Sequence, residues 1–116
     1  MTTAQDAERD ERIMMEIVVD CYDEDEQMIG WYYYLEDTLL FPFTAVCINK
    51  RSSSPIHQGG KFEVVGMASV DECDREMFVE IVWDCDTLAV PLSQLSAPEA
   101  DAETQQAISD WHYWVR

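Results

Sequence analysis

The first third of the chain repeats apolar residues with the period of an α-helix. Between about Glu8 and Tyr22 the apolar positions lie three or four residues apart, which places them on one helix face. The members of this stripe are Ile13, Met14, Ile17, Val18 and Cys21. The pattern predicts a first helix over residues 8–22, with charged residues on its other faces.

The next stretch, Glu24–Leu39, continues with the same period. Its apolar stripe consists of Met28, Trp31, Tyr32, Leu35 and Leu39. Acidic residues at positions 23–26 crowd the first turn, where the positive end of the helix dipole favours them. We therefore expect a second helix. The competing interpretation is a strand, because the aromatic run at residues 31–34 has a high β-propensity.

Beyond Pro42 the apolar residues change to the two-residue period of strands. Turn-rich loops separate short runs with the composition of β-strands. These runs are Phe41–Ile48, Lys61–Ser69, Met77–Trp83 and Leu88–Leu92. A tight turn at residues 84–86 joins the last two runs, and a single helical turn follows at residues 91–95. This succession is typical of a small SH3-like β-barrel or a curled antiparallel sheet.

A last helix is predicted after Ala97 and Pro98, where Asp101 is placed to cap the first turn. Its apolar stripe is Ala107, Ile108, Trp111 and Val115. We thus expect an α+β fold in one domain over residues 1–116, in which N-terminal helices, the small barrel or sheet, and a C-terminal helix follow one another. The tryptophans are expected in its core.

Charge narrows the classes of ligand that this fold could bind. The 116 residues include 24 Asp and Glu against 7 Lys and Arg, which gives a net charge of −17. Such a field repels nucleic acids and anionic membranes, and it favours cations or a basic protein partner. Bound divalent cations would also relieve the repulsion among the carboxylates. We expect neither a nucleic-acid nor a membrane partner.

The absence of several sequence patterns bears on the cellular location of the protein, the state of its cysteines and whether it is an enzyme. It contains no apolar run of about 18 residues, and its acidic start is the reverse of a signal peptide's basic one, which favours the cytoplasm. The four cysteines form no C-x-x-C pair, so we expect reduced thiols. Catalytic motifs such as G-x-S-x-G and H-E-x-x-H are also missing, and we expect no enzyme.

Several segments combine aromatic and apolar residues in a distinctive way. They are Gly30–Asp37 with Leu39, Phe41-Pro42-Phe43, Leu88–Leu92 with Gln94-Leu95, Ala107-Ile108 and Asp110–Trp114. The chain from Glu11 to the C-terminus resembles the small acidic prokaryotic, cyanobacterial-type calcium-binding proteins that lack EF-hands. The resemblance implies reversible Ca²⁺ binding by a cytoplasmic buffer or sensor in calcium signalling. It does not fix the ligands, because most matching residues are apolar.

A standard EF-hand loop does not fit the sequence. If the loop began at Asp23, its sixth position, which needs Gly, would be Met28. Its twelfth position, which needs a bidentate Glu, would be Tyr34. Calcium binding would therefore depend on oxygens from separate segments of the fold.

Antiparallel topology predicts which of the acids meet. The first strand starts at the same end of the meander as the loop between the second and third strands. The end of the second helix adds carboxylates and a hydroxyl beside unpaired carbonyls, and the loop adds further carboxylates. The predicted calcium ligands are Asp37, Thr38 and Glu76, with Glu36, Asp71 and Asp74 as supplements.

Other polar groups are weaker candidates for a site. Asp84 and Asp86 flank a turn, where Asp is common, and the acids at 23–26 suit a helix dipole. We interpret His57 and His112 as structural. Two other functions stay open, an SH3-like module that binds a basic partner peptide and an acidic mimic of nucleic acid. The first would require salt-sensitive protein association without ion selectivity, and the second has no positive motif.

Overall fold

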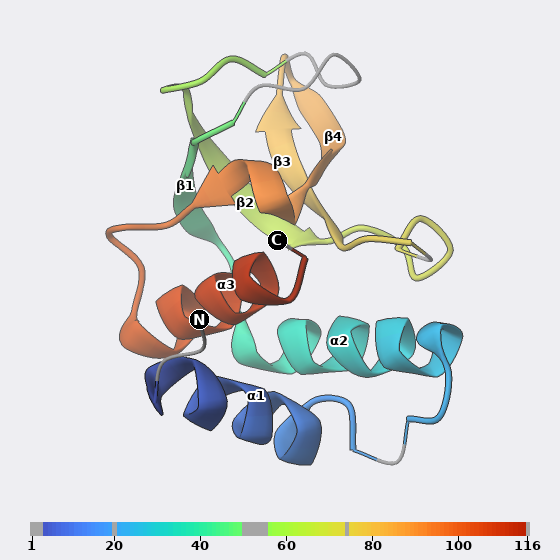
Figure 1. Ribbon diagram of the computed structural model, residues 1–116. Coiled ribbons are helices and arrows are strands. Elements are labelled where there is room, and N and C mark those ends of the chain that lie inside the picture. The colour runs from blue at the N-terminus through green and yellow to red at the C-terminus, as the bar shows by residue number, and fades with distance from the viewer. Residues whose placement is uncertain (1–3, 20, 50–55, 74, 116) are drawn as a thin grey trace.

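The computed structural model describes residues 4–19, 21–49, 56–73 and 75–115 (Figure 1). Figure 1 shows the helices gathered at one end of an antiparallel sheet. The third helix contacts both the second helix and the last strand of the sheet. This arrangement confirms the predicted α+β class. Within the described ranges, no helix has the length and apolar character needed to cross a membrane.

The first helix, α1 (Ala4–Glu16), begins earlier and ends earlier than predicted. The amides of Ile17 and Val18 both donate to the carbonyl of Ile13 at 3.0 Å, and the chain then turns. β-branched residues at this point have a reduced helix propensity. The predicted extension to Tyr22 is therefore wrong, although the isoleucines and Val18 are buried as expected.

The second helix, α2 (Glu24–Thr38), confirms the prediction, and the strand interpretation is wrong. The Asp23 carboxylate accepts a hydrogen bond of 2.8 Å from the amide of Glu26, which helix starts otherwise leave unpaired. The Glu26 carboxylate in turn accepts one of 2.9 Å from the amide of Tyr22. These bonds fix the start of the helix, so the aromatic run continues as helix and buries Trp31.

The strands form one antiparallel sheet with the order β4-β3-β2-β1-β5. Their bounds are β1 Phe43–Cys47, β2 Lys61–Met67, β3 Phe78–Trp83, β4 Asp86–Pro91 and β5 Leu95–Ser96, with a 3-10 turn η1 at Leu92–Gln94 before β5. The sequence did not predict β5, because two residues are too short to carry a period. β4 and β5 lie at opposite edges of the sheet, because β5 pairs with β1. The chain therefore crosses from one edge to the other after β4. The antiparallel sheet is confirmed, and the SH3-like description stays an interpretation.

The last helix, α3 (Ala102–Val115), begins at the predicted cap. The Asp101 carboxylate accepts a hydrogen bond of 3.2 Å from the amide of Thr104, and bonds from Thr104 lower the pKa of Asp101. α2 and α3 are in contact through Trp31 and Trp111, which are both fully buried. Their rings meet edge to face, with centroids 5.2 Å apart. Trp114 is only half-buried, so the tryptophans do not all lie in the core.

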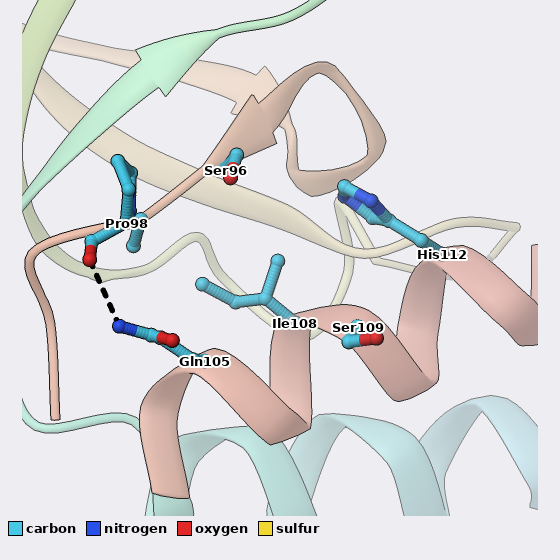
Figure 2. A pocket seen from close by; sticks show the side chains of 7 residues that line it. Ser96, Pro98, Gln105, Ile108, Ser109 and His112 are labelled. Carbon is cyan, nitrogen blue, oxygen red and sulfur yellow. Dashed lines mark hydrogen bonds between the residues drawn. The ribbon is translucent and has the colours of Figure 1, made fainter. Parts of the chain in front are cut away.

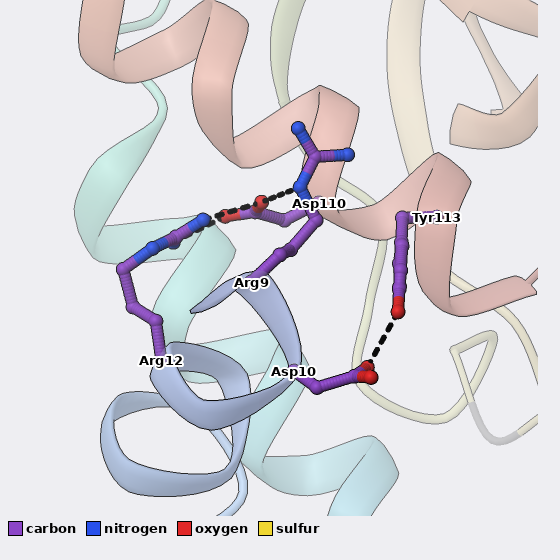
Figure 3. Close-up of polar contacts among 5 residues, drawn as sticks. All are labelled: Arg9, Asp10, Arg12, Asp110 and Tyr113. Carbon is purple, nitrogen blue, oxygen red and sulfur yellow. Dashed lines mark hydrogen bonds and ion pairs between the residues drawn. The ribbon is translucent and has the colours of Figure 1, made fainter. Parts of the chain in front are cut away.

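A buried carboxylate fastens α1 to α3 (Figure 3). The side chain of Asp110 is 0% exposed, and the Arg12 guanidinium donates two hydrogen bonds to it, at 2.6 and 2.8 Å. Arg9 Nε lies 3.4 Å from the same carboxylate. The hydrogen bond with Asp110 raises the pKa of Arg12. Beside this group, the Tyr113 hydroxyl donates to Asp10 at 2.7 Å.

Candidate calcium site

One group of predicted ligands lies on the last turn of α2. Glu36 and Asp37 are exposed, and Thr38 is half-buried. This turn carries no basic residue, so its two carboxylates lie at the negative end of the helix dipole without a compensating charge in the same turn. A bound cation would relieve this unfavourable arrangement.

The second group lies on the loop between β2 and β3. The loop is folded on itself, because the amide of Cys73 donates to the carbonyl of Val70 at 3.2 Å. The Cys73 side chain is buried, and its Sγ accepts a hydrogen bond of 3.3 Å from the amide of Phe78. Asp71 is exposed on the outside of this loop, while Asp74 lies outside the described residues.

Glu76 is separated from Asp71 along the loop and lies two residues before the start of β3. Its side chain is half-buried, and its Oε1 accepts a hydrogen bond of 3.5 Å from the hydroxyl of Ser93 in η1. The neighbouring carbonyl of Met77 accepts a bond of 2.9 Å from the amide of Leu92. Glu76 is therefore positioned by the turn between β4 and β5.

Tyr32 connects α2 to the loop. Its hydroxyl donates to the carbonyl of Ala68 at 3.0 Å, at the point where the loop begins. Burial raises the pKa of Tyr32, and the nearby Glu36 carboxylate raises it further. Glu36 therefore lies near the tyrosine whose hydroxyl bonds to the start of the loop.

The loop itself lies beside the N-terminal half of α2, as Figure 1 shows. Asp71 lines a cavity there together with Met28 and Ile29. Asp37 follows Met28 by nine residues, which is about 13 Å along a helix axis. Among the residues with described positions, no three acidic, cysteine or histidine side chains form a group that could hold a metal ion. The start of β1 and the β2–β3 loop lie at the same end of the sheet, as predicted. The ligand assignment stays a prediction.

The other acidic candidates have structural roles. Asp84 and Cys85 form the tight turn between β3 and β4 with positive φ angles of 49° and 70°. The Asp86 carboxylate accepts a hydrogen bond of 2.8 Å from the amide of Thr87. Asp23 caps α2, as described above. Each of these aspartates therefore has a local structural role, in a turn or at a helix start.

A small cavity between β5 and α3 has a lining without carboxylates (Figure 2). It encloses about 240 Å³. Gln105, which lines the cavity, donates from Nε2 to the carbonyls of Pro98 and Ala100, at 3.0 and 2.8 Å. His112 Nε2 lies 3.3 Å from the carbonyl of Leu92, which fits the structural role predicted for this histidine. These groups do not suit a hard cation, which prefers several carboxylate oxygens.

Comparison with known proteins decides the family. A family model described as calcium binding, Calci_bind_CcbP, matches residues 11–115. The chain belongs to the CcbP family of calcium-binding proteins. This is a calcium-binding family and not an enzyme family, and Ca²⁺ is its ligand. The resemblance to small cyanobacterial-type calcium-binding proteins is confirmed.

Two solved structures are similar to the chain over almost its whole length. The crystal structure of Anabaena CcbP is 41% identical with a TM-score of 0.84, covering 98% of this chain and 94% of that chain. A calcium binding protein in the calcium-binding form is 41% identical with a TM-score of 0.85, covering 99% of this chain and 95% of that chain. No curated protein sequence matches the chain.

Proposed function

We propose that this chain binds Ca²⁺ reversibly in the cytoplasm, as a calcium buffer or sensor, and uses surface carboxylates in place of an EF-hand. The observation that carries the proposal is the 41% identity, over 99% of the chain, to a protein in a calcium-binding form. The net charge of −17 supports it, because divalent cations relieve the repulsion among carboxylates.

The proposed ligands come from the two groups described above. The helix group offers Glu36, Asp37 and the Thr38 hydroxyl, and the loop and strand group offers Asp71, Asp74 and Glu76. Calcium accepts six to eight oxygens in a flexible shell that includes water, so a site with few protein ligands is chemically adequate. The exposure of Glu36, Asp37 and Asp71 also supports reversible exchange, because the ion can reach these carboxylates without unfolding of the protein.

Calorimetric titration of chelator-treated protein with Ca²⁺ at physiological salt tests the ligand proposal. We expect Asp37→Asn and Glu76→Gln each to weaken binding about tenfold, because each removes a charged oxygen ligand. Glu103→Gln is the matched control, since Glu103 is an exposed acid in the first turn of α3. It should leave the affinity nearly unchanged.

The pattern among the variants separates the possible outcomes. If only one site variant weakens binding, the two groups do not share an ion. Unchanged heats in both site variants would show that other oxygens bind Ca²⁺, and family membership would stand. Equal losses in the control and the site variants would indicate a response to overall charge.

A further inference from the structure

Two neighbouring cavities lie along the N-terminal half of α2 and share lining residues. The larger encloses about 730 Å³ between α2 and the C-terminal end of α3, where Trp114 and Val115 line it. The smaller encloses about 520 Å³ between α2 and the β2–β3 loop. Asp25 and Met28 line both. We call this surface the α2 groove.

Several exposed apolar side chains line the α2 groove. Ile29, Val70 and Val115 come from three different elements, and their exposed fractions are 48%, 43% and 40%. Trp114 is half-buried at the same place. Single exposed apolar residues are ordinary, but several gathered along a groove typically mark an interaction surface. Met28, which lines both cavities, adds a flexible side chain that adapts to different partners.

The charged residues that line the groove indicate which class of partner can bind there. Among the described residues that line the groove, Glu24, Asp25 and Asp71 are acidic, and Arg75 is basic. With a net charge of −17, a second copy of this chain would be repelled, as would nucleic acid or an anionic lipid surface. A partner that fills the groove must therefore carry apolar residues on one side and positive charges beside them.

We propose that the α2 groove binds a basic amphipathic helix of a protein partner. In such helix-in-groove recognition, apolar residues at helical spacing enter the groove, and flanking residues set specificity. The apolar face packs on Met28, Ile29 and Trp114, while its Lys and Arg side chains pair with the acidic rim. The groove lies away from Asp37 on the last turn of α2, but it shares Asp71 with the proposed calcium ligands. Peptide binding is therefore tested without Ca²⁺.

Fluorescence anisotropy with a labelled helical peptide of Leu and Lys, measured in chelator, tests the proposal. We expect Val70→Ser to weaken binding about fivefold to tenfold, because it removes a buried apolar contact. Val82→Ser is the matched control, since Val82 is 46% exposed on β3 and lines neither cavity. Glu24→Gln should weaken binding and reduce its salt dependence, whereas Glu103→Gln should not.

Two control peptides complete the test. A peptide with Glu in place of Lys should not bind measurably, and a scrambled peptide without an apolar face should bind at least about tenfold more weakly. Equal binding of the scrambled peptide, or equal effects of Val70→Ser and Val82→Ser, would overturn the proposal. Circular dichroism of each variant confirms that a loss of binding is not a loss of fold.

Discussion

Asp110 joins two helices that are distant in the sequence, α1 and α3. It is a fully buried carboxylate, and its partners are the partly exposed guanidinium groups of Arg12 and Arg9. The acid and Arg12 are 98 residues apart. No local pattern links such distant positions, so the pair could not be predicted from the sequence. Its consequence is that α1 is held by charge as well as by apolar packing.

The two partners should respond unequally to substitution. Arg12→Ala leaves the buried Asp110 carboxylate with only its more distant partner, Arg9. Breaking a buried pair in this way typically lowers the free energy of unfolding by about 3–5 kcal/mol. Asp110→Asn should cost less, because the 26% exposed side chain of Arg12 can turn toward water. Urea unfolding of both variants measures the difference. A larger loss for Asp110→Asn would contradict this account of the pair.

At the scale of elements, the sequence predicted the long periodic segments well. The start of α2, the cap of α3 and four of the strands were found close to the predicted positions. The end of α1 was missed because the apolar stripe continues into Ile17 and Val18, which are buried without being helical. Periodicity reports burial on one face, and it does not distinguish a helix from a turn that packs on the same core.

The contact between the end of α1 and α2 depends on a residue without a side chain. A Cβ at Gly30 would lie 2.7 Å from the carbonyl oxygen of Ile17 and 3.3 Å from Cys21 Sγ. We expect Gly30→Ala to destabilise the protein by about 1–3 kcal/mol through overpacking, despite a gain of about 1 kcal/mol in helix propensity. Thermal unfolding measures the sign, and a more stable variant would contradict the close approach.

For the whole molecule, charge and family were readable from the sequence, but the geometry of the site was not. The topological argument placed the end of α2 and the β2–β3 loop at one end of the sheet. It could not tell where along α2 the loop would lie. That position depends on side-chain contacts such as the Tyr32 bond to Ala68 and the burial of Cys73. The residue types along the chain are therefore enough to predict that the bound ion is Ca²⁺. Predicting its ligands also requires the position of the loop along α2.

The central claim is that the folded chain binds Ca²⁺ specifically, beyond general screening of its 24 acids. Thermal unfolding of chelator-treated protein tests it, with Ca²⁺, Mg²⁺ or NaCl added at equal ionic strength. We expect Ca²⁺ at a hundredfold excess over its Kd to raise the Tm by about 10 °C, which corresponds to about 2.7 kcal/mol. Mg²⁺ should raise it less, because Mg²⁺ gives up its water reluctantly. Equal shifts with Ca²⁺, Mg²⁺ and NaCl would contradict the claim.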